Sequence, residues 1–228
     1  MMKSYLQLLA AGLIFLTQSA PSQNVKPAKI ALGMNETELK TALASSAPLY
    51  INQPSDSPDL YHLVAETETE SFAFTLIDGR VAAFSVMHIL PPGQLPFLPP
   101  GQQPTVSILR SLITKQAWAP AEINKGDALW FSDASGAPLS NALQCRPESG
   151  EAWLPFGRVP CAKPGDPPAK STAGLMKPSL TSYPSNCGVS IHLNQTPADR
   201  EDSVVTSVRY QVLDIKAMNA FLRKHRQH

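Results

Sequence analysis

Two long stretches near the C-terminus alternate apolar and polar residues, and this alternation constrains the fold more than any other feature. In residues 189–194 every second side chain is apolar, and residues 204–213 repeat the pattern after a polar loop. A period of two residues is typical of a β-strand with one buried face. The two stretches therefore predict an antiparallel hairpin whose apolar face packs on a core.

A second hairpin is predicted around Asp78 and Gly79, which separate the strand-like residues 71–77 and 80–88. An Asp-Gly pair between apolar runs favours a two-residue turn, because both central residues need a positive φ. We expect one face to carry Phe72, Phe74 and Leu76, with Val81 and Ala83 opposite them, and to pack on a helix. Further strands are predicted at residues 60–66 and 128–132, the latter ending in a turn at residues 133–136.

Three short helices are predicted. The first spans residues 36–46, where Asn35 and Glu38 form a capping box and Pro48 prevents continuation. The second lies within residues 107–120 and resembles the first in its apolar stripe. The third follows Asp214 as its cap, and its buried side is expected to carry Ile215, Met218, Phe221 and Leu222.

The proline-rich stretch PPGQLPFLPPGQQP, residues 91–104, lies between two parts of similar design. Its prolines make it stiff, and it is long for a loop inside a compact domain. We therefore predict an α+β protein with two related halves, each a short helix packed on an antiparallel sheet. The first half spans residues 23–90 and the second spans residues 105–228, with residues 91–104 as connector. Recognition of a partner through a PxxP pattern is the alternative for this stretch.

The N-terminus predicts export. Residues 1–22 combine a lysine, a short apolar run and small residues, which is the pattern of a secretory signal peptide. The chain is therefore expected to be periplasmic or secreted, with no transmembrane segment after cleavage. The formal net charge of +1 argues against a nucleic-acid partner.

The chain contains three cysteines, Cys145, Cys161 and Cys187. In an oxidising compartment they predict one disulfide and one unpaired thiol. Cys145–Cys187 is favoured, because Cys187 immediately precedes a predicted strand, and it would hold the loop region 145–187. Its entropic effect on the unfolded chain would be about 4 kcal/mol. Cys145–Cys161, which closes a shorter loop, is the alternative.

The run GMNETEL, residues 33–39, resembles the helix start of small outer-membrane lipoproteins with a β-lactamase-inhibitor-protein-like fold. Asn35 stands where that group usually has Thr, and Ala-Pro follows the helix where Gly-x-Pro is usual. The run LWFSD at residues 129–133, together with Gly136, Cys145 and Cys187, resembles a group of uncharacterised proteobacterial secreted proteins. The first resemblance implies a helix–sheet repeat and a role in envelope assembly or protein inhibition without catalysis.

Motifs for catalysis or metal binding are absent from the sequence. It contains no H-E-x-x-H, C-x-x-C or G-x-S-x-G pattern, and no two histidines are four residues apart. We therefore predict no catalytic residue, cofactor or metal site. His192 is expected to be solvated on the polar face of its strand, and His88 to be structural. Glu66, Glu68 and Glu70 are expected on one face of an extended segment as a solvated edge, with binding of a divalent cation or a basic partner as the alternative.

Three aromatic residues in predicted loops, Phe97, Trp153 and Phe156, are candidates for partner binding. The sequence favours an exported non-catalytic protein that binds another envelope or secreted protein. One alternative is an extracytoplasmic hydrolase that uses His88 with the carboxylates of residues 66–70. The other is a secreted inhibitor that inserts residues 91–104 into its target.

Overall fold

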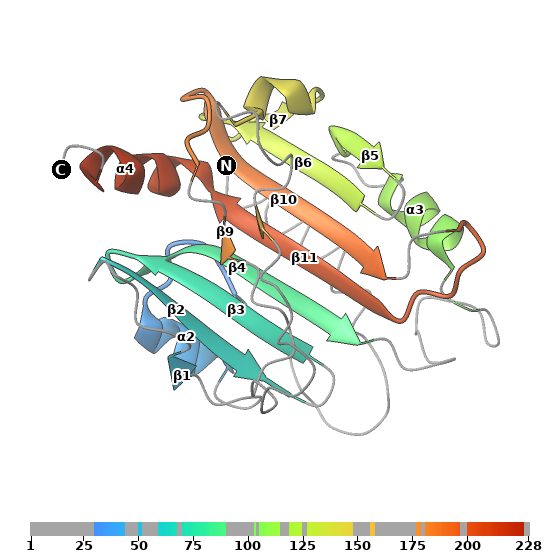
Figure 1. The fold of residues 1–228 in the computed structure, drawn as a ribbon, viewed down its shortest axis with the longest axis horizontal. Helices are drawn as coiled ribbons and strands as arrows, with labels where there is room; N and C mark the ends of the chain where they lie inside the picture. The colour runs from blue at the N-terminus through green and yellow to red at the C-terminus, as the bar shows by residue number, and fades with distance from the viewer. Residues whose placement is uncertain are drawn as a thin grey trace.

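The structure, a computed structural model, is described here for residues 30–43, 50–51, 59–67, 70–89, 103, 105–114, 119–124, 127–147, 156–157, 177–178, 181–196 and 200–225. Its dominant feature is one continuous antiparallel sheet (Figure 1). The helical elements are α2 (Glu36–Leu43), α3 (Val106–Thr114), η1 (Ala142–Cys145) and α4 (Ile215–His225). The strands are β1 (Tyr50–Ile51), β2 (Leu60–Glu66), β3 (Glu70–Ile77), β4 (Arg80–Ile89), β5 (Glu122–Asn124), β6 (Asp127–Asp133), β7 (Pro138–Leu139), β8 (Phe156–Gly157), β9 (Lys177–Pro178), β10 (Cys187–Thr196) and β11 (Ser207–Asp214).

The strand order is β1-β2-β3-β4-β11-β10-β6-β5, with β7 also paired to β6. The pairing of β4 with β11, for example Val86 opposite Tyr210, joins the early and late parts of the chain in the middle of the sheet. The prediction of two helix-on-sheet halves is therefore wrong, and the fold is a single β-rich sheet with a few short helices. Two separate sheets would leave β4 and β11 as edges with unpaired backbone groups, and pairing them removes both edges.

The β3–β4 hairpin confirms the Asp-Gly turn. Asp78 and Gly79 both have positive φ, 48° and 73°. The prediction that Val81 and Ala83 lie on the same face is wrong for Ala83, because the register shifts after Thr75. Val81 then pairs with Leu76, but Ala83 pairs with Thr75 and lies on the opposite face. A bulge of this kind inserts one residue and reverses the side on which later residues point.

The predicted helix caps are present. The Glu38 backbone N–H donates to Asn35 Oδ1 at 2.9 Å, and the Asn35 N–H donates to Glu38 Oε2 at 2.7 Å. At the start of α4, the Ala217 N–H donates to Asp214 Oδ1 at 2.9 Å. Within the described residues α2 ends at Leu43, earlier than expected, and α3 begins one residue before its predicted range.

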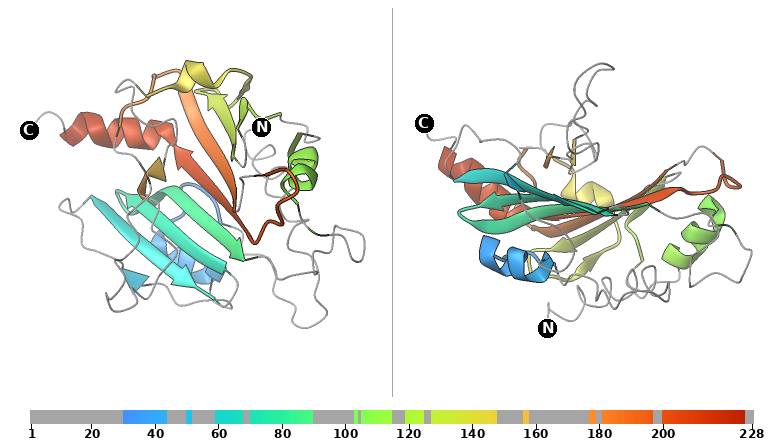
Figure 2. Two further views of the ribbon diagram at one scale, coloured as in Figure 1. Left: turned by 45° about the vertical axis from the view of Figure 1, so that its right-hand side comes forward. Right: turned by 90° about the horizontal axis from the view of Figure 1, so that it is seen from below.

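The two faces of the sheet carry different elements. Helices α2 and α3 lie on one side, here called the α2–α3 face (Figure 2). Leu39 and Leu43 of α2 and Val106 and Leu109 of α3 belong to its apolar cluster. Helix α4 lies against the other side, the α4 face, through residues that include Ile215, Met218 and Phe221, as predicted. The short β8–β9 ladder also lies on the side away from α2 and α3 (Figure 2).

Among the described residues, none of the helices has both the length and the apolar character that a membrane crossing requires.

Candidate functional site

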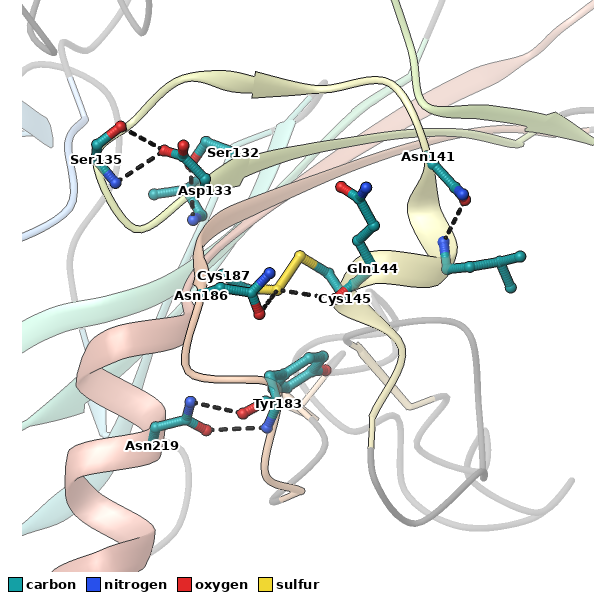
Figure 3. The surroundings of a disulfide bond; sticks show 12 residues. Ser132, Asp133, Ser135, Asn141, Gln144, Cys145, Tyr183, Asn186, Cys187 and Asn219 are labelled. Atoms are coloured by element: carbon teal, nitrogen blue, oxygen red, sulfur yellow. Dashed lines mark hydrogen bonds between the residues drawn. A yellow bond between two sulfur atoms is a disulfide. The ribbon is translucent and has the colours of Figure 1, made fainter.

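The disulfide joins Cys145, the last residue of η1, to Cys187, the first residue of β10, with their Cα atoms 5.8 Å apart (Figure 3). The predicted pairing is thus confirmed, and Cys161 lies outside the described residues. The bridge spans a sequence separation of 42 residues. It therefore holds together the two ends of the intervening segment, residues 146–186, at the start of the interior strand β10.

Local hydrogen bonds fix the turn beside the disulfide (Figure 3). The Asp133 carboxylate accepts from the Ser135 hydroxyl at 2.7 Å and from the Ser135 and Ala137 backbone N–H groups, each at 2.8 Å. The Ser135 hydroxyl and the Ala137 N–H lower the pKa of Asp133 below its usual value. Gly188 is required next to Cys187, because a Cβ atom there would lie 2.2 Å from the Asp133 carbonyl oxygen.

A pair of hydrogen bonds also joins the C-terminal end of the 146–186 segment to α4. The buried Asn219 side chain accepts from the Tyr183 N–H at 3.0 Å and donates to the Tyr183 carbonyl at 2.9 Å. This pair imitates a strand ladder, since one amide side chain satisfies both backbone groups of one residue. The C-terminal end of the segment is therefore held by the disulfide and by α4 (Figure 3).

The α4 face carries a buried polar network centred on His192. Its Nε2 lies 2.7 Å from Asp127 Oδ1, and its Nδ1 lies 2.7 Å from Gln211 Oε1. Asn194 Nδ2 donates to the same Asp127 oxygen at 2.8 Å. The prediction that His192 is solvated is wrong, because its side chain is only 1% exposed. Both ring nitrogens are engaged, so this imidazole links β6, β10 and β11 and has no nitrogen left for a substrate.

The sequence could not reveal this network, because its partners come from strands that are distant along the chain. His192 faces Gln211 through the predicted hairpin, and both positions belong to its polar side. Asp127 reaches His192 only through the pairing of β6 with β10. The one available signal was the set of polar residues on a single side of residues 189–213.

The α2–α3 face carries a second contact between a histidine and a carboxylate. It lies at the ends of β3 and β4 that are away from the Asp78-Gly79 turn. Glu70 Oε1 lies 2.8 Å from His88 Nδ1, and the His88 ring stacks on Tyr210 with ring centroids 6.1 Å apart. The side chains of Glu70 and His88 are 29% and 17% exposed. Burial raises the pKa of the Tyr210 phenol, and the charge of Glu70 raises it further. Because the side chains of Glu70 and His88 are partly exposed, this cluster is reachable from solvent, whereas His192 is buried.

The predicted arrangement of the glutamates on one extended face is wrong. Glu66 ends β2 and Glu70 begins β3, and the Thr67 N–H donates to the Glu70 carbonyl at 2.8 Å across the turn between them. The register places Glu66 opposite Ser71, on the α4 face, whereas Glu70 lies on the α2–α3 face. Glu68 lies outside the described residues.

The three candidate partner-binding aromatics are not brought together by the part of the chain that the structure describes. Phe156 lies in β8 and pairs with Pro178, whereas Phe97 and Trp153 lie outside the described residues. Among the described residues there is no cluster of three or more histidine, cysteine, aspartate or glutamate side chains that could hold a metal ion.

Comparison with known proteins finds no match: no family model, no curated protein and no solved structure corresponds to this chain.

Proposed function

We propose that this chain is an exported protein that binds another envelope or secreted protein through its disulfide-closed segment, residues 146–186. The observation that carries the proposal is the Cys145–Cys187 bridge, which holds both ends of a long segment on a rigid sheet. Disulfides form and persist mainly in oxidising compartments, so the bridge supports the export that residues 1–22 predict.

The anchoring of the segment resembles that of a presented binding loop. Its start follows η1, which Asn141 caps through the Leu143 N–H at 2.9 Å, and its end is clamped by Asn219. Binding residues are concentrated on loops that a rigid scaffold positions. The segment contains Trp153 and Phe156, and large aromatics are the residues that most often dominate binding energy at interfaces.

The buried His192 network supports a binding role over catalysis for the α4 face. For His192 to act as a general base, one ring nitrogen must be within reach of the proton that it removes. In His192 one nitrogen contacts Asp127 and the other contacts Gln211. This arrangement joins β6, β10 and β11.

The proposal is tested by chemical crosslinking and affinity capture from native envelope or culture-medium extracts. The mature protein is compared with a variant carrying Trp153→Ala and Phe156→Ala and with a variant that lacks residues 91–104. We expect one stoichiometric partner with the intact protein and with the deletion variant, and loss of that partner with the double substitution.

Retention of the same partner by the double variant would contradict the role of the segment. Loss of the partner only on deletion of residues 91–104 would support the alternative of an inhibitor that uses the proline-rich stretch. Leu143→Ala in η1 serves as a matched control, because Leu143 is an exposed apolar residue outside the segment.

A further inference from the structure

We propose that Glu70, His88 and Tyr210 form a hydrolytic site that acts on an uncharged carboxylic ester. This activity goes beyond the binding role and uses different residues. The three residues lie on the adjacent strands β3, β4 and β11, with Glu70 directly opposite His88 in the register. The 2.8 Å contact between Glu70 Oε1 and His88 Nδ1 is the observation on which the site is built.

The two histidines that contact carboxylates in the sheet, His192 and His88, differ in whether a ring nitrogen is left to accept a proton. In His192 both ring nitrogens have partners, and the side chain is buried. In His88 the carboxylate holds Nδ1, and Nε2 makes no hydrogen bond within the described part of the chain. A carboxylate that fixes the Nδ1–H tautomer presents Nε2 as a base, which is the arrangement of hydrolytic carboxylate–histidine pairs. His88 is therefore the histidine that is placed to accept a proton.

Tyr210 supplies a neutral hydrogen-bond donor beside this base. Its ring stacks on the imidazole at an interplanar angle of 20° and contacts Phe84 edge-on. Because burial and the Glu70 charge both raise its pKa, the phenol keeps its proton at neutral pH. A protonated phenol next to a general base can stabilise the negative oxygen that develops when a carbonyl is attacked.

The surroundings indicate an uncharged substrate. The strand neighbours of His88 on this face, apart from Glu70 and Tyr210, are the buried apolar residues Phe72, Val86 and Val208. The Glu70 carboxylate disfavours an anionic substrate such as a phosphate ester through like-charge repulsion.

The reaction balances with water as the only co-reactant. A water oxygen bonds to the ester carbonyl carbon while His88 Nε2 takes one of its protons, and the carbonyl electron pair moves to the oxygen, which accepts a hydrogen bond from Tyr210. The carbon–alkoxy bond then breaks as the carbonyl reforms, and the leaving alkoxide takes the proton from His88. Glu70 stays in contact with Nδ1 throughout and keeps the ring in position.

The site is tested by the hydrolysis of p-nitrophenyl butyrate by the oxidised mature protein. We expect His88→Gln to lower kcat/KM by on the order of 100-fold, the usual range for loss of a general base. His225→Gln is the matched control and should leave the rate unchanged, because His225 also lies near a carboxylate, Asp59, but at the end of α4. Tyr210→Phe should lower kcat by on the order of 100-fold with little change in KM.

Glu70 acts as a positioning residue, so its test must distinguish a lost orientation of the His88 ring from a loss of folding. Glu70→Gln should lower kcat at unchanged KM, and Glu70→Asp should restore part of the rate, while circular dichroism reports an intact fold. If His88→Gln does not fold, diethyl pyrocarbonate modification of the wild-type protein replaces it. Loss of activity must then follow carbethoxylation of His88, as mapped by mass spectrometry.

Hydrolysis that is equal in wild type and His88→Gln, or absent from the wild-type protein, overturns the site. Modification of His88 without loss of activity also overturns it. Neither result affects the partner-capture experiment, which depends on different residues.

Discussion

The two faces of the central sheet are both buried, but different chemistry fills them. On the α2–α3 face one cross-strand row is apolar throughout and consists of Phe74, Phe84, Val212, Ile191 and Trp130. On the α4 face the neighbouring row consists of Ser85, Gln211, His192 and Leu129. The comparison teaches that alternation along a strand reports the side on which a residue lies and does not report whether that side meets solvent.

The largest effect is expected on the apolar face. Phe74→Ala removes a side chain that is 1% exposed, and we expect it to lower the free energy of unfolding by about 3–5 kcal/mol. Phe74→Leu, which keeps more of the volume, should cost about 1–2 kcal/mol. Urea unfolding followed by tryptophan fluorescence measures both. Equal effects of the two variants would show that this row is not closely packed.

The next effect concerns the disulfide at the start of β10. Replacing both Cys145 and Cys187 with Ser should lower the free energy of unfolding by about 2–4 kcal/mol. Cys161→Ser is the matched control, since the bridge joins the other two cysteines. Urea denaturation without reductant gives the comparison. A larger loss for Cys161→Ser than for the double variant would contradict the pairing.

A smaller effect is expected in the polar row. His192→Leu leaves the buried Gln211 without its partner and should lower the free energy of unfolding by about 1–3 kcal/mol. Combining it with Gln211→Leu should cost less than the sum of the two single changes, because the double variant leaves neither polar group unpaired. A double-mutant cycle in urea measures this coupling. Strict additivity would show that the two side chains do not stabilise each other.

The smallest effect is a dependence of stability on pH at the Asp133 turn. The pKa of Asp133 is lowered in the folded state, so its contribution is present above the unfolded pKa, about 3.9, and is lost as the pH falls through the lower folded value. Asp133→Asn should therefore be less stable than wild type at neutral pH, and the difference should shrink in acid. Thermal unfolding across this range checks the sign, and a difference that grows in acid would contradict it.

The features that the sequence predicted correctly depend on neighbouring residues. The Asp78-Gly79 turn, the Asn35–Glu38 capping box and the Asp214 cap each involve residues within three positions of one another. The disulfide was inferred from only three cysteines and the start of one strand. Local chemistry of this kind is readable from the chain because the partners are near in sequence.

The features that were missed depend on pairing between distant strands. No local sequence pattern predicts that β4 pairs with β11 or that β6 pairs with β10. These pairings join the two predicted sheets into one. They also bring Asp127 to His192. Glu70 and His88 were named together only in the hydrolase alternative, and their contact was not predicted, because the turn between β2 and β3 was not recognised.

The β4–β11 pairing also sets the order in which the molecule can be completed. During synthesis from the N-terminus, β2, β3 and β4 emerge more than a hundred residues before β11, so β4 must wait as an open edge. Contacts between such distant segments form slowly, and an unpaired edge invites pairing with other chains. A nascent chain that stops before residue 207 therefore exposes a strand edge that is prone to aggregation, and the addition of β11 closes the sheet.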